Sequence, residues 1–124
     1  MNFFFEMWKS FGHAWRGLLV TFRTERSFRI QVAAAFVVFL VLILLPLQGW
    51  ERAFLLLATA SVLVLELLNS MVERLVDLMK PRVHGYVRDI KDIMAAAVLV
   101  VSLFALAIGI LILWPYAGRF FSQV

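Results

Sequence analysis

The sequence contains no cysteine and few charged residues. Without cysteine, disulfide bonds and thiolate metal sites are excluded. Only 16% of the 124 residues are Asp, Glu, Lys or Arg, whereas 64% are hydrophobic. A water-soluble domain of this size has too little interior to bury that much apolar surface, so we expect lipid to be the solvent of this chain. The length allows a single domain over residues 1–124.

Further absences narrow the class of protein. The 12 Lys and Arg residues form no basic run typical of nucleic-acid binding, so we expect no nucleic-acid partner. The start MNFFFEMWKSFGHAWRGL has no basic region before its apolar residues, so we expect no secretory signal peptide. The phosphate-binding motif GxxxxGK[ST] and the Gly-rich kinase loop are also absent. Any nucleotide site must therefore be built in another way.

Three long apolar runs predict three membrane-spanning helices. The first run has Gln31 as its one polar side chain between Ile30 and Leu47. At a rise of about 1.5 Å per residue, such a run approaches the hydrocarbon thickness of a bilayer, about 30 Å. We therefore predict an all-α membrane protein with spans at about residues 28–47, 53–79 and 92–115.

The connections between the spans are predicted from turn-forming and polar residues. Residues 48–52 are expected to form a short turn, and Pro81 discourages continuation of the second helix. The polar stretch 80–92, which also contains Gly85, is expected to be a surface loop. Pro115 is expected to help end the third span.

The N-terminal segment, about residues 3–22, has the spacing of an amphipathic helix. Large apolar residues recur every three or four positions, at Phe4, Trp8, Phe11, Trp15, Leu18 and Phe22. Lys9, His13 and Arg16 fall between them. An aromatic face opposite a basic face favours a helix that lies in the membrane interface. Packing against a partner protein is the alternative.

Basic residues are unevenly distributed around the predicted spans. Ten of the 12 precede the first span or flank the connection between the second and third spans. Only Arg52 and Arg119 lie on the other side of the membrane. The positive-inside rule therefore predicts that the N terminus and this connection face the cytoplasm.

A polar stripe interrupts the second apolar run at Glu66, Asn69, Ser70, Glu73 and Asp77. At about 100° per residue, all five positions fall within a helix face about 100° wide. Ionisable groups in a membrane segment are costly and mark a functional site by default. Solvation near the headgroups, or a structural hydrogen bond from Glu66 to another helix, is the alternative, but neither readily accounts for five aligned residues.

The residue types in the stripe indicate a chemistry. Glu66 lies deepest, and a desolvated carboxylate suits a general base. Glu73 lies nearer water and offers oxygen to a hard divalent cation. A base and a cation beside basic residues suggest phosphoryl transfer to a lipid alcohol. Arg74 points off the stripe and is expected to reach the membrane interface.

Three motifs occur in order along the chain. They are W-x-G-L with E-x-x-x-R, at 15–18 and 25–29, then E-x-x-N-S-x-x-E-x-x-x-D, at 66–77, then Lys91-Asp92 before a small-residue run. Together they resemble the motifs of the small integral-membrane lipid kinases of bacteria, the diacylglycerol kinase and undecaprenol kinase family. The resemblance covers nearly the whole chain.

The resemblance implies a homotrimeric helical bundle in the bacterial cytoplasmic membrane, with ATP as phosphate donor and Mg²⁺ as metal. Glu66 would be the catalytic base, and Asn69 would position the reacting groups. The other implied roles are metal binding by Glu25 and Glu73, nucleotide binding by Lys91, Asp92, Asp77, Gly17 and His13, and lipid contact by Ser70 and Trp15.

Some positions depart from the family pattern. The small-residue run 93–97 lacks the usual glycine. His84 is expected to be solvated or to lie beside the nucleotide. The stretches 24–29 and 113–115 resemble the undecaprenol kinase branch of the family more closely, which implies undecaprenol rather than diacylglycerol as the lipid alcohol. A hydrophobic groove discriminates poorly between the two tails, so both substrates stay open.

Two other classes are alternatives to a lipid kinase. A non-enzymatic assembly or transport protein could use the stripe to pack helices or to bind ions. A lipid enzyme of another type is the second. Membrane phosphatases need an Arg/His/Ser/His/Asp arrangement, but the two histidines, His13 and His84, lie in separate segments. Alcohol phosphatidyltransferases need a denser aspartate cluster than this chain contains.

Overall fold

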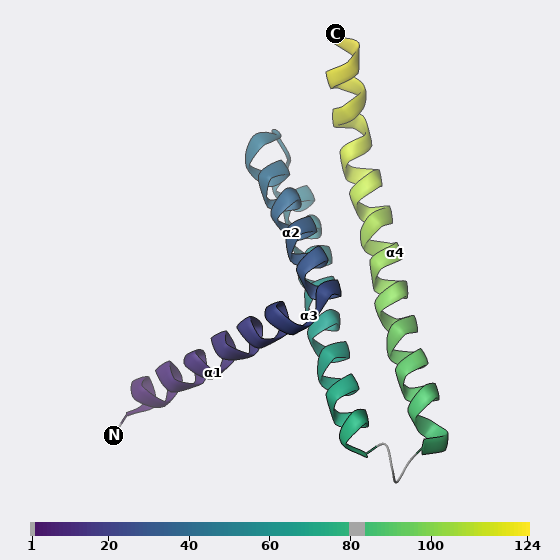
Figure 1. Ribbon diagram of the computed structural model, residues 1–124. Helices are drawn as coiled ribbons and strands as arrows, with labels where there is room; N and C mark the ends of the chain where they lie inside the picture. The colour runs from purple at the N-terminus through teal and green to yellow at the C-terminus, as the bar shows by residue number, and fades with distance from the viewer. Residues whose placement is uncertain (1, 80–83) are drawn as a thin grey trace.

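Four helices make up the computed structural model, which describes residues 2–79 and 84–124 (Figure 1). They are α1 (Phe3–Thr24), α2 (Arg26–Leu44), α3 (Gly49–Met79) and α4 (His84–Ser122). No strand occurs in the described residues. α2, α3 and α4 are long and apolar enough to cross a membrane. The predicted all-α architecture, with an N-terminal helix and three helices of spanning length, is therefore confirmed.

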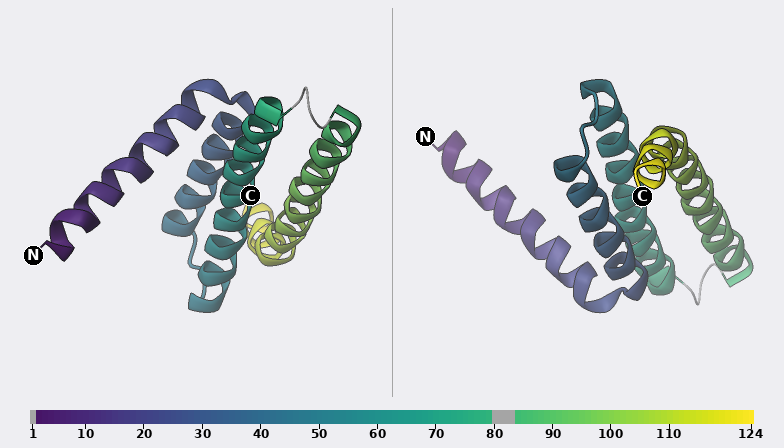
Figure 2. Two further views of the ribbon diagram at one scale, coloured as in Figure 1. Left: turned by 90° about the horizontal axis from the view of Figure 1, so that it is seen from below. Right: turned by 90° about the horizontal axis from the view of Figure 1, so that it is seen from above.

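α1 leaves the other three helices at an angle, so the N terminus lies far from them (Figures 1 and 2). The helix ends at Thr24, and the next residue, Glu25, has an extended backbone, with φ −111° and ψ 110°. Arg29 donates from Nη1 to the carbonyl oxygens of Phe22 and Arg23, at 2.9 and 3.0 Å. Carbonyls in the last turn of a helix lack partners within the helix. Arg29 therefore caps α1 from the first turn of α2.

α2 and α3 form an antiparallel hairpin (Figure 1). The turn predicted over residues 48–52 is wrong from Gly49 onward, because α3 already begins there. Glu51, in the first turn of α3, accepts a hydrogen bond from the backbone N–H of Gln48 at 2.9 Å. A glutamate at this position that bonds back to the residue before the helix is half of a capping box, which stabilises an early helix start.

α4 extends beyond the predicted third span at both ends. Residues 84–92, expected to form a loop, are helical, whereas residues 80–83 of that predicted loop lie outside the described residues. Gly85 stands in the first turn, where helix amides lack partners in any case, so glycine weakens the helix little. At the other end the helix continues through Pro115. Proline removes one backbone hydrogen bond, and the contact of Tyr116 with α3 holds this part of the helix.

The buried core lies at the end of the bundle where α2 turns into α3. Its buried apolar residues are Leu42, Leu47, Leu55 and Ile112. Beside them the Tyr116 hydroxyl donates to Glu51 Oε1 at 2.5 Å, although the two residues are 65 positions apart. Glu51 is only 7% exposed, so this bond is shielded from the surroundings. It joins α3 to α4 at the end of the bundle opposite to the α1–α2 junction.

Candidate active site

Glu66 is buried between α2 and α3, with 5% of its surface exposed. The Ser27 hydroxyl, in the first turn of α2, donates to Oε1 of Glu66 at 3.0 Å. Ser27 lies 17 residues before the end of α2 at Leu44, and Glu66 lies 17 residues after the start of α3 at Gly49. In an antiparallel helix pair, equal distances from the turn place two residues opposite each other. The hairpin therefore brings a hydroxyl to the deepest carboxylate.

Glu25 approaches the polar stripe from the junction between α1 and α2. Ser70, which is 4% exposed, donates from its hydroxyl to Oε1 of Glu25 at 3.3 Å. Ser70 is one helical turn beyond Glu66, and Glu73 follows Ser70 by three residues. Glu25, which Ser70 binds, and Glu73, which lies about one turn beyond Ser70 on α3, are both half-buried.

Asp77, the residue of the polar stripe nearest the α3–α4 connection, contacts α4. Lys91 Nζ donates to Asp77 Oδ1 at 2.9 Å. Lys91 precedes the apolar run of α4. The hydrogen bond that its ammonium group donates to Asp77 raises the pKa of Lys91. Asp92 forms an exposed ion pair with Arg88, at 3.9 Å. Exposed ion pairs contribute little net free energy, so Lys91 can exchange Asp77 for an anionic ligand at small cost.

The other predicted site residues lie outside the hydrogen-bonded group of Ser27, Glu66, Ser70 and Glu25. Asn69 is half-buried on α3. His13, Trp15 and Gly17 are exposed on α1, and an added Cβ at Gly17 would meet nothing within 4 Å. The structure thus leaves these three residues on an open helix surface rather than within the buried carboxylate group. The side chain of His84 lies outside the described residues.

The oxygen ligands of the site suit a magnesium ion that is shared with a phosphate group. Among the described residues, no group of three or more His, Cys, Asp or Glu side chains could hold a metal ion. Glu25 and Glu73 offer two half-buried carboxylates on either side of the Ser70 position in the site. Mg²⁺ is usually bound by one or two carboxylates together with substrate phosphates. The residues present therefore fit an ion that binds together with a nucleotide.

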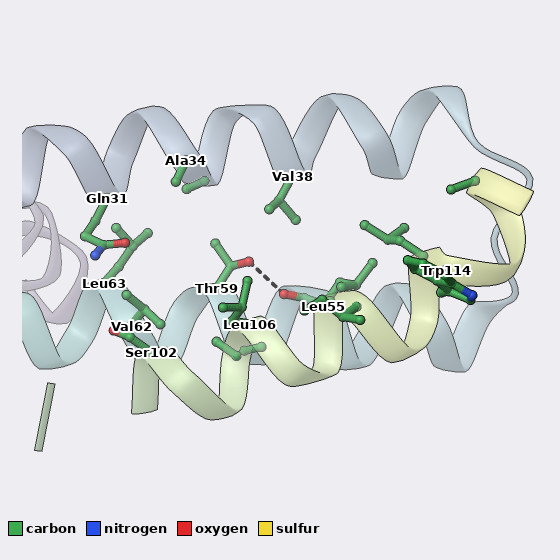
Figure 3. Close-up of a pocket in the computed structure, with 17 residues that line it drawn as sticks. Gln31, Ala34, Val38, Leu55, Thr59, Val62, Leu63, Ser102, Leu106 and Trp114 are labelled. Atoms are coloured by element: carbon green, nitrogen blue, oxygen red, sulfur yellow. Dashed lines mark hydrogen bonds between the residues drawn. The ribbon is translucent and has the colours of Figure 1, made fainter. Parts of the chain in front are cut away.

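An apolar groove of about 580 Å³ lies between α2, α3 and α4 (Figure 3). Gln31 lies at one end of the groove and Trp114 at the other. The Thr59 hydroxyl donates to a backbone carbonyl of α3 at 2.8 Å, so this polar group in the groove wall is satisfied. Gln31 lies one helical turn from Ser27 on α2. A hydrocarbon chain in the groove would therefore end close to the Ser27–Glu66 pair.

Three residues that shape the site, Thr24, Ser27 and Arg74, were not predicted as site residues from the sequence. Ser27 could have been found by counting residues outward from the α2–α3 turn, as the matched spacing to Glu66 now makes clear. Arg74 is exposed, and its Nη2 donates to Thr24 Oγ1 at 2.7 Å. These two residues are 50 positions apart, and no periodicity in the sequence relates them.

Comparisons with known proteins cover most of the chain. The model of the prokaryotic diacylglycerol kinase family matches residues 12–113. The chain is 39% identical over 115 residues to the undecaprenol kinase of Bacillus subtilis (strain 168), covering 93% of this chain and 91% of that protein. It is 36% identical over 107 residues to a diacylglycerol kinase of Synechocystis sp., covering 86% of this chain and 61% of that protein. It is 28% identical over 110 residues to the diacylglycerol kinase of Escherichia coli (strain K12), covering 89% and 90%.

The fold and the buried carboxylates define a small helical membrane protein with a polar centre on one helix face. The family model spans well over half of the sequence, so the chain belongs to the prokaryotic diacylglycerol kinase family. The predicted family resemblance and the predicted enzyme class, a lipid kinase, are therefore confirmed. This result favours a kinase over the non-enzymatic, phosphatase and phosphatidyltransferase alternatives.

Proposed function

We propose that this protein transfers the γ-phosphate of ATP to the alcohol group of a membrane lipid, with Glu66 as the general base. The observation that carries the proposal is the buried Glu66 carboxylate, held by Ser27 one helical turn from the Glu25–Ser70 contact. A buried base beside two further carboxylates has no evident purpose in a purely structural helix. It suits deprotonation of a hydroxyl next to a metal-bound phosphate.

Glu66 would act on the lipid hydroxyl directly. Ser27 donates to Oε1 of Glu66 and so fixes the orientation of the carboxylate. The other oxygen of Glu66, Oε2, would accept the proton of the lipid hydroxyl. The hydroxyl oxygen would attack the γ-phosphorus of ATP, and the bond to the β,γ-bridging oxygen would break to release ADP. Asn69, three residues along the same helix, would position the reacting groups. Most of the rate enhancement would come from alignment of the two reactants and from charge stabilisation.

Glu25 and Glu73 would hold Mg²⁺ together with the phosphates of ATP. The ion would offset the negative charge that develops on the transferred phosphoryl group. Lys91, Asp92 and Asp77 would bind the nucleotide from the end of the stripe nearest the α3–α4 connection. Asp77 follows Glu66 by 11 residues, or about 16 Å along α3 at the usual helical rise. A nucleotide laid along α3 from Glu66 to Lys91 would therefore contact the whole stripe.

The remaining site assignments concern α1. Gly17 and His13 would contact the nucleotide, and Trp15, with Ser70 of α3, would contact the lipid. Because α1 is exposed along most of its length, these contacts require ligand or membrane against its surface. The row of aromatic residues along α1 suits a position in the membrane interface.

We further propose a homotrimer in the bacterial cytoplasmic membrane, with the N terminus and the active site facing the cytoplasm. The uneven distribution of basic residues supports this orientation. Exposed apolar side chains along α2, α3 and α4 offer faces for helix packing within the membrane. The trimer itself is inferred from the family resemblance.

The lipid alcohol is proposed to be undecaprenol, with diacylglycerol as the alternative. The groove that ends near Ser27 would take part of the hydrocarbon tail. Purified protein in mixed micelles that contain both lipids at equal concentration would be given labelled ATP and Mg²⁺. We expect undecaprenyl phosphate to form faster than phosphatidate. Faster formation of phosphatidate would assign the protein to diacylglycerol instead, and label in neither lipid would contradict the proposed function.

Lys91→Met should weaken nucleotide use selectively. Hydrogen bonds to charged groups contribute enough free energy for the KM for ATP to rise by about tenfold or more. The KM for the lipid should stay near its original value, because Lys91 of α4 contacts Asp77, which lies 11 residues along α3 from Glu66. Steady-state kinetics with each substrate varied in turn would measure this. Lys9→Met, which removes an exposed lysine of α1, is the matched control. An unchanged KM for ATP would remove Lys91 from the nucleotide site.

A further inference from the structure

Two side chains of α3 hold the junction between α1 and α2. Ser70 donates to Glu25, and Arg74 donates to Thr24, at 3.3 and 2.7 Å. Ser70 and Arg74 are four residues apart and therefore lie on the same side of α3. Their partners are adjacent in the chain. The last residue of α1 and the extended residue that follows it are thus each bound to α3 by a separate hydrogen bond.

The hydroxyl of Thr24 links Arg74 to the backbone of α1. Thr24 Oγ1 donates its proton to the carbonyl of Val20 at 2.8 Å, which leaves the oxygen to accept from Arg74. The amide of Glu25 donates to the carbonyl of Thr21 at 2.8 Å. The Arg74 guanidinium therefore fastens the final turn of α1, from which Glu25 directly follows.

The contact between Arg74 and Thr24 affects the orientation of Glu25, the residue that follows Thr24. The extended backbone of Glu25 separates two helices that point in different directions, so rotation there would swing the carboxylate and α1 together (Figure 1). Ser70 holds the carboxylate itself, at the longer of the two distances. Arg74 holds the backbone behind it through a charge-assisted bond, which is stronger than a neutral one.

We infer that Arg74 is a positioning residue that orients the Glu25 carboxylate toward Glu73, acting through Thr24 and the end of α1. The inference rests on the proposed function, in which Glu25 and Glu73 bind Mg²⁺. In this role Arg74 touches neither ATP nor lipid. It supports a metal ligand from outside the coordination shell, and loss of such support lowers metal affinity by roughly 10- to 100-fold in known metal sites.

The first test measures the dependence of the rate on free Mg²⁺ at saturating ATP and lipid. Arg74→Ala should raise the Mg²⁺ concentration that gives half the maximal rate by about tenfold, with little change in kcat. Thr24→Val removes the same contact from the other side and should have a similar effect. The double variant should need no more Mg²⁺ for half the maximal rate than either single variant, because both substitutions break the same Arg74–Thr24 contact. Arg23→Ala, which removes a neighbouring exposed arginine charge, should behave as the original protein.

The second test needs no catalysis. Amide hydrogen exchange over residues 20–29 should speed up in Arg74→Ala and Thr24→Val, and stay unchanged in Arg23→Ala. Unchanged exchange and unchanged Mg²⁺ dependence in Arg74→Ala would overturn the inference. A raised KM for ATP with unchanged exchange would also overturn it, since Arg74 would then contact the nucleotide directly. If the original protein phosphorylates no lipid, the proposed function fails, and the exchange measurement alone still decides whether Arg74 fastens the junction.

Discussion

Glu66→Gln should lower kcat by about 10²- to 10⁴-fold, the range typical for loss of a general base. Glutamine has nearly the same shape and can still accept the Ser27 hydrogen bond through its amide oxygen. It cannot take a proton from the lipid hydroxyl at neutral pH. Nucleotide affinity should therefore stay close to that of the original protein, because the side chain contributes to the reaction step rather than to ATP binding.

Two measurements distinguish the loss of kcat in Glu66→Gln from a loss of nucleotide affinity. Label transfer from ATP in mixed micelles gives kcat, and calorimetric titration with a non-hydrolysable ATP analogue gives the binding constant. Ser61→Ala is a suitable control, because Ser61 lies on the same helix and its hydroxyl only bonds the carbonyl of Leu57. Substantial turnover by a folded Glu66→Gln protein would show that another group accepts the proton.

Glu73→Gln should instead change the dependence on magnesium. A neutral amide is a weaker ligand for Mg²⁺ than a carboxylate, and Glu73 is one of the two carboxylates that we propose to bind the ion. We expect the free Mg²⁺ needed for half-maximal rate to rise by more than tenfold, with partial recovery of the rate at high Mg²⁺. Glu25→Gln should have a similar effect, because it removes the second proposed ligand.

The contrast between Glu66 and Glu73 makes this prediction specific. High Mg²⁺ should restore activity to Glu73→Gln but not to Glu66→Gln. Glu6→Gln, at an exposed position on α1, controls for the loss of a carboxylate as such. If Glu73→Gln has the same magnesium dependence as the original protein, Glu73 is not a metal ligand and the proposed division of roles is wrong.

The polar stripe of α3 could be predicted because it depends on periodicity alone. A continuous helix fixes the relative directions of Glu66, Ser70 and Asp77, and the structure has one uninterrupted helix through all three. The burial of Glu66 was predicted from its depth in an apolar segment, whereas the burial of Ser70 was not predicted.

Contacts between distant residues were less accessible to sequence reasoning. The bond from Tyr116 to Glu51 depends on how α4 lies against the α2–α3 turn, which no local pattern specifies. The start of α4 was missed for a different reason. Polar residues with a nearby proline and glycine are typical of loops. In this chain, however, Gly85 falls in the first turn of the helix, where it does little harm.

Phosphate transfer from ATP to a lipid alcohol is the activity on which every proposed residue role depends. Purified protein would be incubated in mixed micelles with γ-labelled ATP, Mg²⁺ and undecaprenol or diacylglycerol, and the lipids would then be extracted. We predict label in the lipid phase that requires Mg²⁺ and is absent with Glu66→Gln. A folded protein that transfers no label to either lipid, or one whose transfer is unaffected by Glu66→Gln, would contradict the central claim that Glu66 drives a lipid kinase reaction.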